Sequence, residues 1–104
     1  MMDDGLVLCA ANAYIQKYYF NEEFRILPQS VREELQILCV SFTEEVGGIF
    51  TLYFHEDGTL CMRTEASESD ALYDEIGAGL RIQKIRRDKE ELFRSLELFY
   101  QTFC

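Results

Sequence analysis

The sequence lacks tryptophan, and its 104 residues include only one proline and six glycines. It therefore has no segment that resembles a linker or a low-complexity tract. Long apolar runs are also missing, because the longest stretch without a charged residue, 5–16, is too short to span a bilayer. The acidic pair Asp3 and Asp4 stands where a secretory signal would carry basic residues. These absences predict a cytoplasmic protein that does not enter a membrane.

Ligands for metals are sparse as well. His55 is the only histidine, and no C-x-x-C spacing occurs among the four cysteines, Cys9, Cys39, Cys61 and Cys104. Structural zinc sites are built from closely spaced Cys and His residues. In a reducing cytoplasm, isolated thiols stay reduced and pack as small hydrophobic groups. We therefore expect free thiols, and neither a metal nor another cofactor.

Basic residues are few: 10 Lys and Arg stand against 19 Asp and Glu, which gives a net charge of −9. This balance disfavours binding to nucleic acids and to anionic membranes, because like charges repel. The charge is also unevenly placed along the chain. Five bases and one acid lie within 81–89, whereas 65–75 holds five carboxylates and no base.

Apolar residues are abundant, at 48% of the chain, and include eight Phe and six Tyr. A domain of this size buries roughly 60–70% of the surface that its unfolded chain exposes. Disorder is therefore disfavoured. The sequence predicts a single folded domain over residues 1–104.

Two helices are predicted in the first half of the chain. Apolar residues at spacings of three and four indicate a helix over 6–20, which Asn21 ends or follows with a short capped turn. A second helix is expected to start at a capping box, Ser30 to Glu33, and to stop at the glycine pair 47–48. Within it, 36–43 contains a continuous apolar run, so a buried strand in a three-stranded meander remains an alternative there.

Residues 49–65 predict a β-hairpin. Its turn is 56–58, with Gly58 in the left-handed conformation that forms a bulge. The register that follows gives one apolar face, with Phe54 opposite Leu60, Leu52 opposite Met62, and Phe50 opposite Thr64. The fold class is therefore α+β, with helices packed on a small antiparallel hairpin or meander.

The C-terminal part, 69–103, predicts a long helix capped by Ser67 or Ser69. Unbroken, its 35 residues would reach about 52 Å. A compact domain of this size has a radius of gyration of only about 13 Å. The helix is therefore expected either to break near 77–79 or to project and pack on a second chain.

The apolar stripe of this helix is the predicted interaction surface. A monomer that left its aromatic rings in water would expose an unusually large apolar patch. In a two-fold dimer, the basic stretch 81–89 of one chain would lie near the acidic stretch 65–75 of the other. We therefore expect a homodimer that uses Ile82, Ile85, Leu92, Phe93, Leu96, Phe99, Tyr100 and Phe103 from the stripe, with Arg81, Lys84, Arg86 and Arg87 from the basic stretch.

No group of residues forms a recognisable catalytic motif. The G-x-G at 77–79 has Ile82 where a dinucleotide-binding fingerprint has its third glycine, and no strand precedes it. Asp70, Asp74 and Glu75 would place carboxylates on neighbouring turns of a helix, where the helix dipole alone favours acidic residues. We assign no catalytic, cofactor-binding or metal-binding residue.

Four short motifs carry a family resemblance: LCAAN at 8–12, QKYYFN at 16–21, FTEEVGG at 42–48 and DEIG at 74–77. Together they resemble a family of small acidic proteins from gut Firmicutes that is known only as a domain of unknown function. The resemblance extends over nearly the whole chain. The sequence departs from the family pattern at Ala10, where the family has a glycine. It implies no substrate, cofactor or catalytic residue. A weaker, architectural likeness is to bacterial immunity proteins that neutralise toxins.

The sequence thus favours a non-catalytic protein-binding or adaptor domain that self-associates. An acidic inhibitor of immunity or antitoxin type is the alternative, because its carboxylates can imitate a polyanion and occupy a basic active site. A small enzyme, the third reading, needs Asp70, Asp74 or His55 to converge in a pocket with shifted pKa values.

Overall fold

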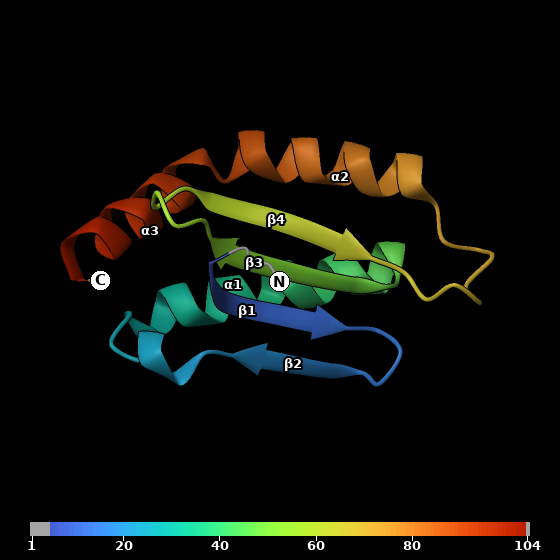
Figure 1. Cartoon of the computed structure of the whole chain (residues 1–104), viewed down its shortest axis with the longest axis horizontal. Coiled ribbons are helices and arrows are strands. Elements are labelled where there is room, and N and C mark those ends of the chain that lie inside the picture. Colours follow the sequence, from blue (N-terminus) through green and yellow to red (C-terminus); the bar gives the residue numbers. More distant parts are fainter. Residues whose placement is uncertain (1–4, 104) are drawn as a thin grey trace.

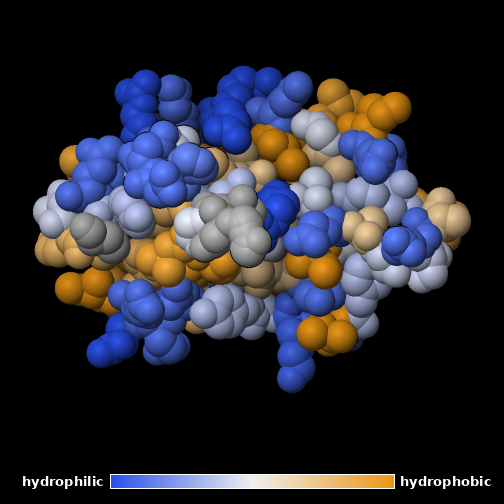
Figure 2. Space-filling model, in the orientation of Figure 1, coloured by the Kyte–Doolittle hydropathy of each residue, from blue (hydrophilic) through white to orange (hydrophobic). Residues whose placement is uncertain are grey.

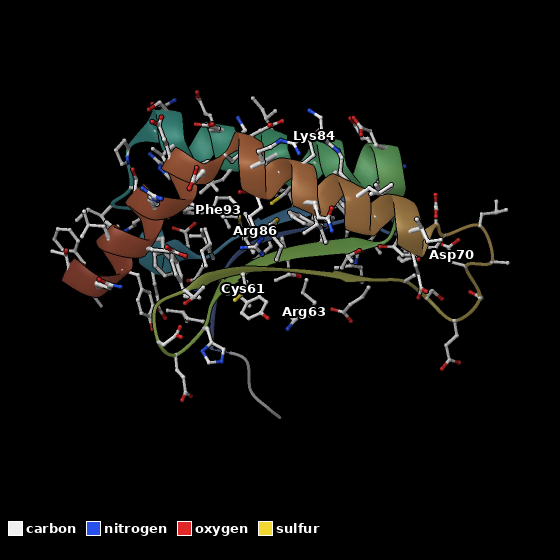
Figure 3. All side chains as sticks on the ribbon, turned by 90° about the horizontal axis from the view of Figure 1, so that it is seen from above. Cys61, Arg63, Asp70, Lys84, Arg86 and Phe93 are labelled. Atoms are coloured by element: carbon white, nitrogen blue, oxygen red, sulfur yellow. The ribbon has the colours of Figure 1, made fainter. Side chains whose placement is uncertain are left out.

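A four-stranded antiparallel sheet forms one layer of the protein, and the helices pack on one of its faces (Figures 1 and 3). The computed structural model describes residues 5–103, so the predictions that concern Asp3, Asp4 and Cys104 lie outside the described residues. The sheet has the strand order β2-β1-β3-β4. The elements, in chain order, are β1 (Leu6–Asn12), β2 (Lys17–Phe20), a 3-10 turn (Glu22–Phe24), α1 (Gln29–Val46), β3 (Ile49–Phe54), β4 (Leu60–Glu65), α2 (Glu75–Asp88) and α3 (Glu90–Phe103).

The helix predicted over 6–20 is wrong, because this segment forms the hairpin of β1 and β2. Two features account for its helix-like spacing: the register of β1 against β3 shifts between Val7 and Cys9, and the apolar Tyr14 and Ile15 lie exposed in the β1–β2 turn. Because of the shift, Leu8 and Cys9 are both fully buried, and the alternation that marks a strand is lost. Asn21 then caps the 3-10 turn, with its side chain accepting a hydrogen bond from the N–H of Glu23.

Helix α1 is confirmed, and 36–43 is helical throughout. The predicted capping box is wrong, however, because the helix is preceded by Pro28 and begins before Ser30. The carbonyl of Pro28 accepts hydrogen bonds from the N–H groups of Val31 and Arg32, so the helix starts without a side-chain cap. At the other end, Gly47 follows the last helical residue with a φ of +84°, as predicted for a glycine stop.

The hairpin of β3 and β4 is confirmed with the predicted register. Gly58 has a φ of +93°, which is the left-handed region expected for the bulge residue of this turn. The apolar face of the hairpin points toward the helices: Phe50, Leu52, Phe54 and Leu60 are fully buried. The opposite face carries Cys61 and Arg63, which Figure 3 shows on the side of the sheet away from the helices.

The C-terminal region is helical but differs from the prediction at two points. It begins at Glu75 after Asp74, whose side chain accepts a hydrogen bond from the N–H of Gly77, so neither predicted serine is the cap. It breaks at Lys89, which has φ −111° and ψ 24°, and not near 77–79. Asp70 therefore lies in the loop before α2, and the three carboxylates do not occupy neighbouring turns of one helix.

The break at Lys89 lets α3 turn toward the hairpin, so that its aromatic residues enter the core. The ring centroids of Phe99 and Phe24 are 6.2 Å apart, and Tyr100 stacks on Phe54 with their ring centroids 4.6 Å apart. Most of the C-terminal stripe is thus covered within one chain.

Candidate functional site

The predicted interaction stripe is mostly part of the protein's own core. Ile85, Phe93 and Leu96 are buried, and four more of its residues pack against the core as half-buried side chains: Ile82, Leu92, Phe99 and Tyr100. Only Phe103 is largely exposed. The premise that a monomer leaves this stripe in water is therefore wrong, although dimerisation itself stays a prediction.

The basic stretch 81–89 makes several ion pairs within the chain. Arg81 pairs with Glu45 and Lys89 with Glu34, each at 2.9 Å, which connects α2 and its C-terminal end to α1. The two remaining pairs share one acid, since both Lys84 and Arg87 contact Asp88.

Arg86 differs from these four bases. Within the described residues it has no ion-pair partner, and its side chain is exposed. Figure 3 shows Lys84 on the side of α2 that faces α1, and Arg86 on the side that faces the sheet. Glu75, at the start of α2, is likewise exposed and unpaired among residues 5–103. The two unpaired charges of α2 are 11 residues apart, which is just over three helical turns, and so lie on the same flank.

A row of large aliphatic side chains is exposed on the outer surface of the same helix. Ile76 is 78% exposed and Leu80 is 62% exposed, and they are one turn apart. Leu72, in the turn that precedes the helix, is 94% exposed. We call these three residues the α2 patch. The space-filling view shows hydrophobic side chains gathered over the start of α2, at the upper right (Figure 2).

The sequence did contain a signal for the α2 patch, because its residues recur at intervals of four. Two apolar rows run along 72–103, however, and periodicity alone does not say which of them faces the core. The row that begins at Ile82 continues into α3 and is longer, which is why the sequence predicts it as the interface. In the structure that longer row is inside and the shorter row is outside.

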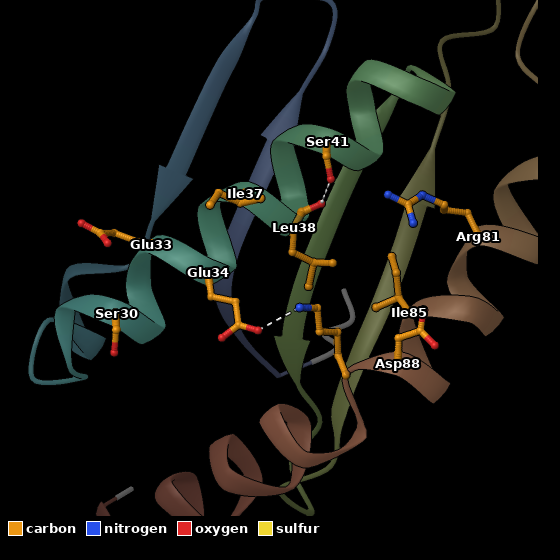
Figure 4. Close-up of a pocket in the computed structure, with 10 residues that line it drawn as sticks. Ser30, Glu33, Glu34, Ile37, Leu38, Ser41, Arg81, Ile85 and Asp88 are labelled. Carbon is orange, nitrogen blue, oxygen red and sulfur yellow. Dashed lines mark hydrogen bonds and ion pairs between the residues drawn. The ribbon is translucent and has the colours of Figure 1, made fainter.

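A groove of about 400 Å³ lies between α1 and the α2–α3 junction (Figure 4). Its apolar lining consists of Ile37, Leu38 and Ile85, and the Lys89–Glu34 ion pair crosses it. Arg81 lines the groove as well and already pairs with Glu45. The two cations on its walls are thus compensated by carboxylates of α1, and Glu33, which also lines the groove, accepts a hydrogen bond from the side chain of Gln29.

The residues considered for carboxylate chemistry are dispersed. Asp70 accepts a hydrogen bond from the hydroxyl of Tyr14 at 2.7 Å, which ties the β1–β2 turn to the loop before α2. This bond is the main cause that raises the pKa of Tyr14. Asp74 caps α2, and His55 lies beside Asp57 in the β3–β4 turn. The structure therefore does not bring Asp70, Asp74 and His55 together.

Two further features concern metals and membranes. Within residues 5–103, no group of three or more His, Cys, Asp or Glu side chains is placed to hold a metal ion. No helix in this part of the chain has both the length and the apolar character needed to cross a membrane.

Comparison with known proteins gives one match. The model of a family of unknown function, DUF6145, matches residues 5–104. No significant match was found among curated proteins or solved structures. Since the matched region covers nearly the whole sequence, the predicted membership of an uncharacterised family is confirmed, and the chain belongs to the DUF6145 family of unknown function.

Proposed function

We propose that the protein is a non-catalytic protein-binding domain that acts as a homodimer, in which the α2 helices of two copies pack antiparallel through the α2 patch. The observation that carries this proposal is the exposure of Ile76 and Leu80 on α2 and of Leu72 in the turn before it. Contiguous exposed apolar patches on soluble proteins commonly mark interaction sites. A second copy would bury these side chains and so remove them from water.

The charges that flank the patch support a second copy as its occupant. A two-fold axis near Leu80 makes every contact occur twice. In an antiparallel pair centred there, Glu75 lies opposite the partner's Arg86, because both occupy the same flank at similar distances from the axis. These are the two charges of α2 that have no ion-pair partner among the described residues. The arrangement also brings the basic stretch of one chain near the acidic stretch of the other.

Gly79 lies beside Leu80 and favours a close approach of the two helices. A Cβ atom built at this position has no heavy atom within 4 Å, so the surface there is open. The aliphatic stems of Gln83 and Arg87, which are also exposed, extend the surface on which the partner's Ile76 would pack.

The experiment compares the solution mass of three proteins by sedimentation equilibrium at micromolar concentration. The unmodified protein is expected at twice the chain mass of 12.2 kDa, and Leu80→Glu at the mass of one chain, because a carboxylate would then be buried at the two-fold axis. Ile37→Glu is the matched control, since Ile37 is 69% exposed on α1. It is expected to remain dimeric. A monomeric unmodified protein, or equal loss of the dimer in both variants, contradicts the proposal.

A further inference from the structure

Two cysteines from different elements meet in the core. Cys9 of β1 and Cys39 of α1 have Sγ atoms 3.6 Å apart, and both residues are fully buried. They are free thiols. A disulfide has an S–S distance of about 2.05 Å, so the sulfurs need to approach by about 1.5 Å, a shift within the range of small χ1 rotations.

Tyr18 separates this thiol pair from a cleft. It lies on β2, opposite Ala11 in the neighbouring strand, and its hydroxyl oxygen is buried without a hydrogen bond of normal geometry. Burial, and then the nearby Cys9 thiol, raise the pKa of Tyr18. The cleft has a volume of about 630 Å³ and lies between the first hairpin and α1, with Tyr18 and Val40 in its wall.

We propose that Cys9 and Cys39 form a redox-active dithiol, which a low-molecular-weight disulfide oxidises to an intramolecular disulfide after entering through this cleft. The proposal is independent of dimerisation, because neither cysteine belongs to the α2 patch.

The reaction is a two-step thiol–disulfide exchange. The thiolate of one cysteine attacks a sulfur of the small disulfide, which forms a mixed disulfide and releases one small thiolate. The thiolate of the second cysteine then attacks the protein-side sulfur, which forms the Cys9–Cys39 bond and releases the second small thiolate. The two protons lost by the cysteines are taken up by the two released thiolates. The protein dithiol loses two electrons, and the small disulfide gains them.

The surroundings of the two cysteines make this oxidation slow while the first hairpin stays packed against α1. The hydrogen bond with Cys9, followed by burial, raises the pKa of Cys39, so little thiolate is present at neutral pH. The small disulfide also has to pass Tyr18. Local opening of the first hairpin, whose outer strand β2 has only four residues, therefore limits the rate.

The test uses a Cys61→Ser/Cys104→Ser protein, which keeps only the two core thiols. The folded protein is incubated with glutathione disulfide at neutral pH, and its mass is followed after alkylation of the remaining thiols. The expected product has lost two hydrogen atoms, carries no glutathione, and yields a linked peptide containing Cys9 and Cys39. Adding Cys39→Ser is expected to abolish this product.

Access through the cleft is tested with three tyrosine variants in the same background. Tyr18→Ala is expected to accelerate oxidation by about an order of magnitude, because the barrier between the cleft and Cys9 is removed. Tyr18→Phe keeps the ring and is expected to react within about twofold of the background protein. Tyr19→Ala is the matched control on the opposite face of the sheet, and it is expected to leave the rate unchanged. If the disulfide forms only after unfolding in urea, or if Tyr19→Ala accelerates the reaction as much as Tyr18→Ala, the proposal is overturned.

Discussion

The ammonium group of Lys89 lies 2.9 Å from a carboxylate oxygen of Glu34. This contact joins the break between α2 and α3 to the N-terminal half of α1. Lys89 occupies the one polar position in the apolar stripe of the C-terminal region, and a straight helix would have carried its charge toward the core. The break instead places the ammonium group beside a carboxylate at a partly exposed position.

We expect this ion pair to contribute little to stability. Both side chains are more than a third exposed, so a double-mutant cycle with Glu34→Gln and Lys89→Met should give a coupling energy below about 1 kcal/mol. The measurement is urea unfolding at low and at high salt. The coupling energy should decrease with added salt. A coupling energy above this limit that does not change with salt would show that the pair behaves as a buried ion pair.

The start of α2 depends on its cap, whereas the start of α1 does not depend on Ser30. Asp74→Ala should lower the free energy of unfolding by about 0.5–2 kcal/mol, because the N–H of Gly77 loses its acceptor. Ser30→Ala should change it by less than about 0.5 kcal/mol, since no side-chain cap is present at Pro28 and Ser30 is exposed. Equal losses in the two variants, measured by urea unfolding, would contradict this difference.

Substitution by alanine should change the stability of the protein in opposite directions at two of its glycines. Gly58→Ala should destabilise the protein by about 1 kcal/mol, because a Cβ atom is disfavoured at its φ of +93°. In the Leu80→Glu background, which is expected to be monomeric, Gly79→Ala should stabilise by up to about 1 kcal/mol, since Gly79 is inside a helix and the single chain has space there for a methyl group. Thermal or urea unfolding at matched protein concentration distinguishes the two outcomes. A destabilised Gly79→Ala protein would show that the helix tolerates no side chain there.

The β3–β4 turn should weaken in acid. The pKa of Asp57 is lowered, first by the N–H of Thr59, which donates to its carboxylate at 2.9 Å. A lowered pKa in the folded state means that the carboxylate stabilises the fold above the unfolded value of 3.8 and that this stabilisation is lost as the pH falls further. Asp57→Asn should therefore be less stable than the parent protein at pH 7, with the difference shrinking below the unfolded pKa. A difference that does not depend on pH would contradict this cause.

The elements that could be predicted from the sequence are those whose signals are local. The turn at 56–58 and the alternation on both sides of it specify the register of β3 and β4 without reference to the rest of the chain. The first hairpin lacks such a local signal, because the shift between Val7 and Cys9 removes the alternation of β1, and that shift arises from pairing with a distant strand, β3. Local spacing does not report such long-range pairing.

The sequence predicts a dimer contact through the apolar stripe of 82–103, with the charged stretches 65–75 and 81–89 beside it. The structure places most of that stripe in the core and leaves a different apolar row, the α2 patch, exposed. Ile85 points inward whereas Leu80 is exposed, a difference that depends on how α2 lies against α1. The position of the helix break also decided which aromatic residues of α3 enter the core, and the only local sign of that break was a lysine within the apolar stripe.

The most direct test of the antiparallel α2 dimer is the dimer dissociation constant of four proteins, measured by sedimentation equilibrium: the unmodified chain, Glu75→Arg, Arg86→Glu, and the two substitutions combined. Each single variant places like charges opposite one another twice, so its dissociation constant should rise by about twofold to thirtyfold. The combined variant restores opposite charges with their positions exchanged, and its constant should return to that of the unmodified protein. Two results would contradict the account, because Glu75 would then not face the partner's Arg86. In the first, the losses of dimer affinity in the two single variants add up in the combined variant. In the second, all four proteins sediment as single chains.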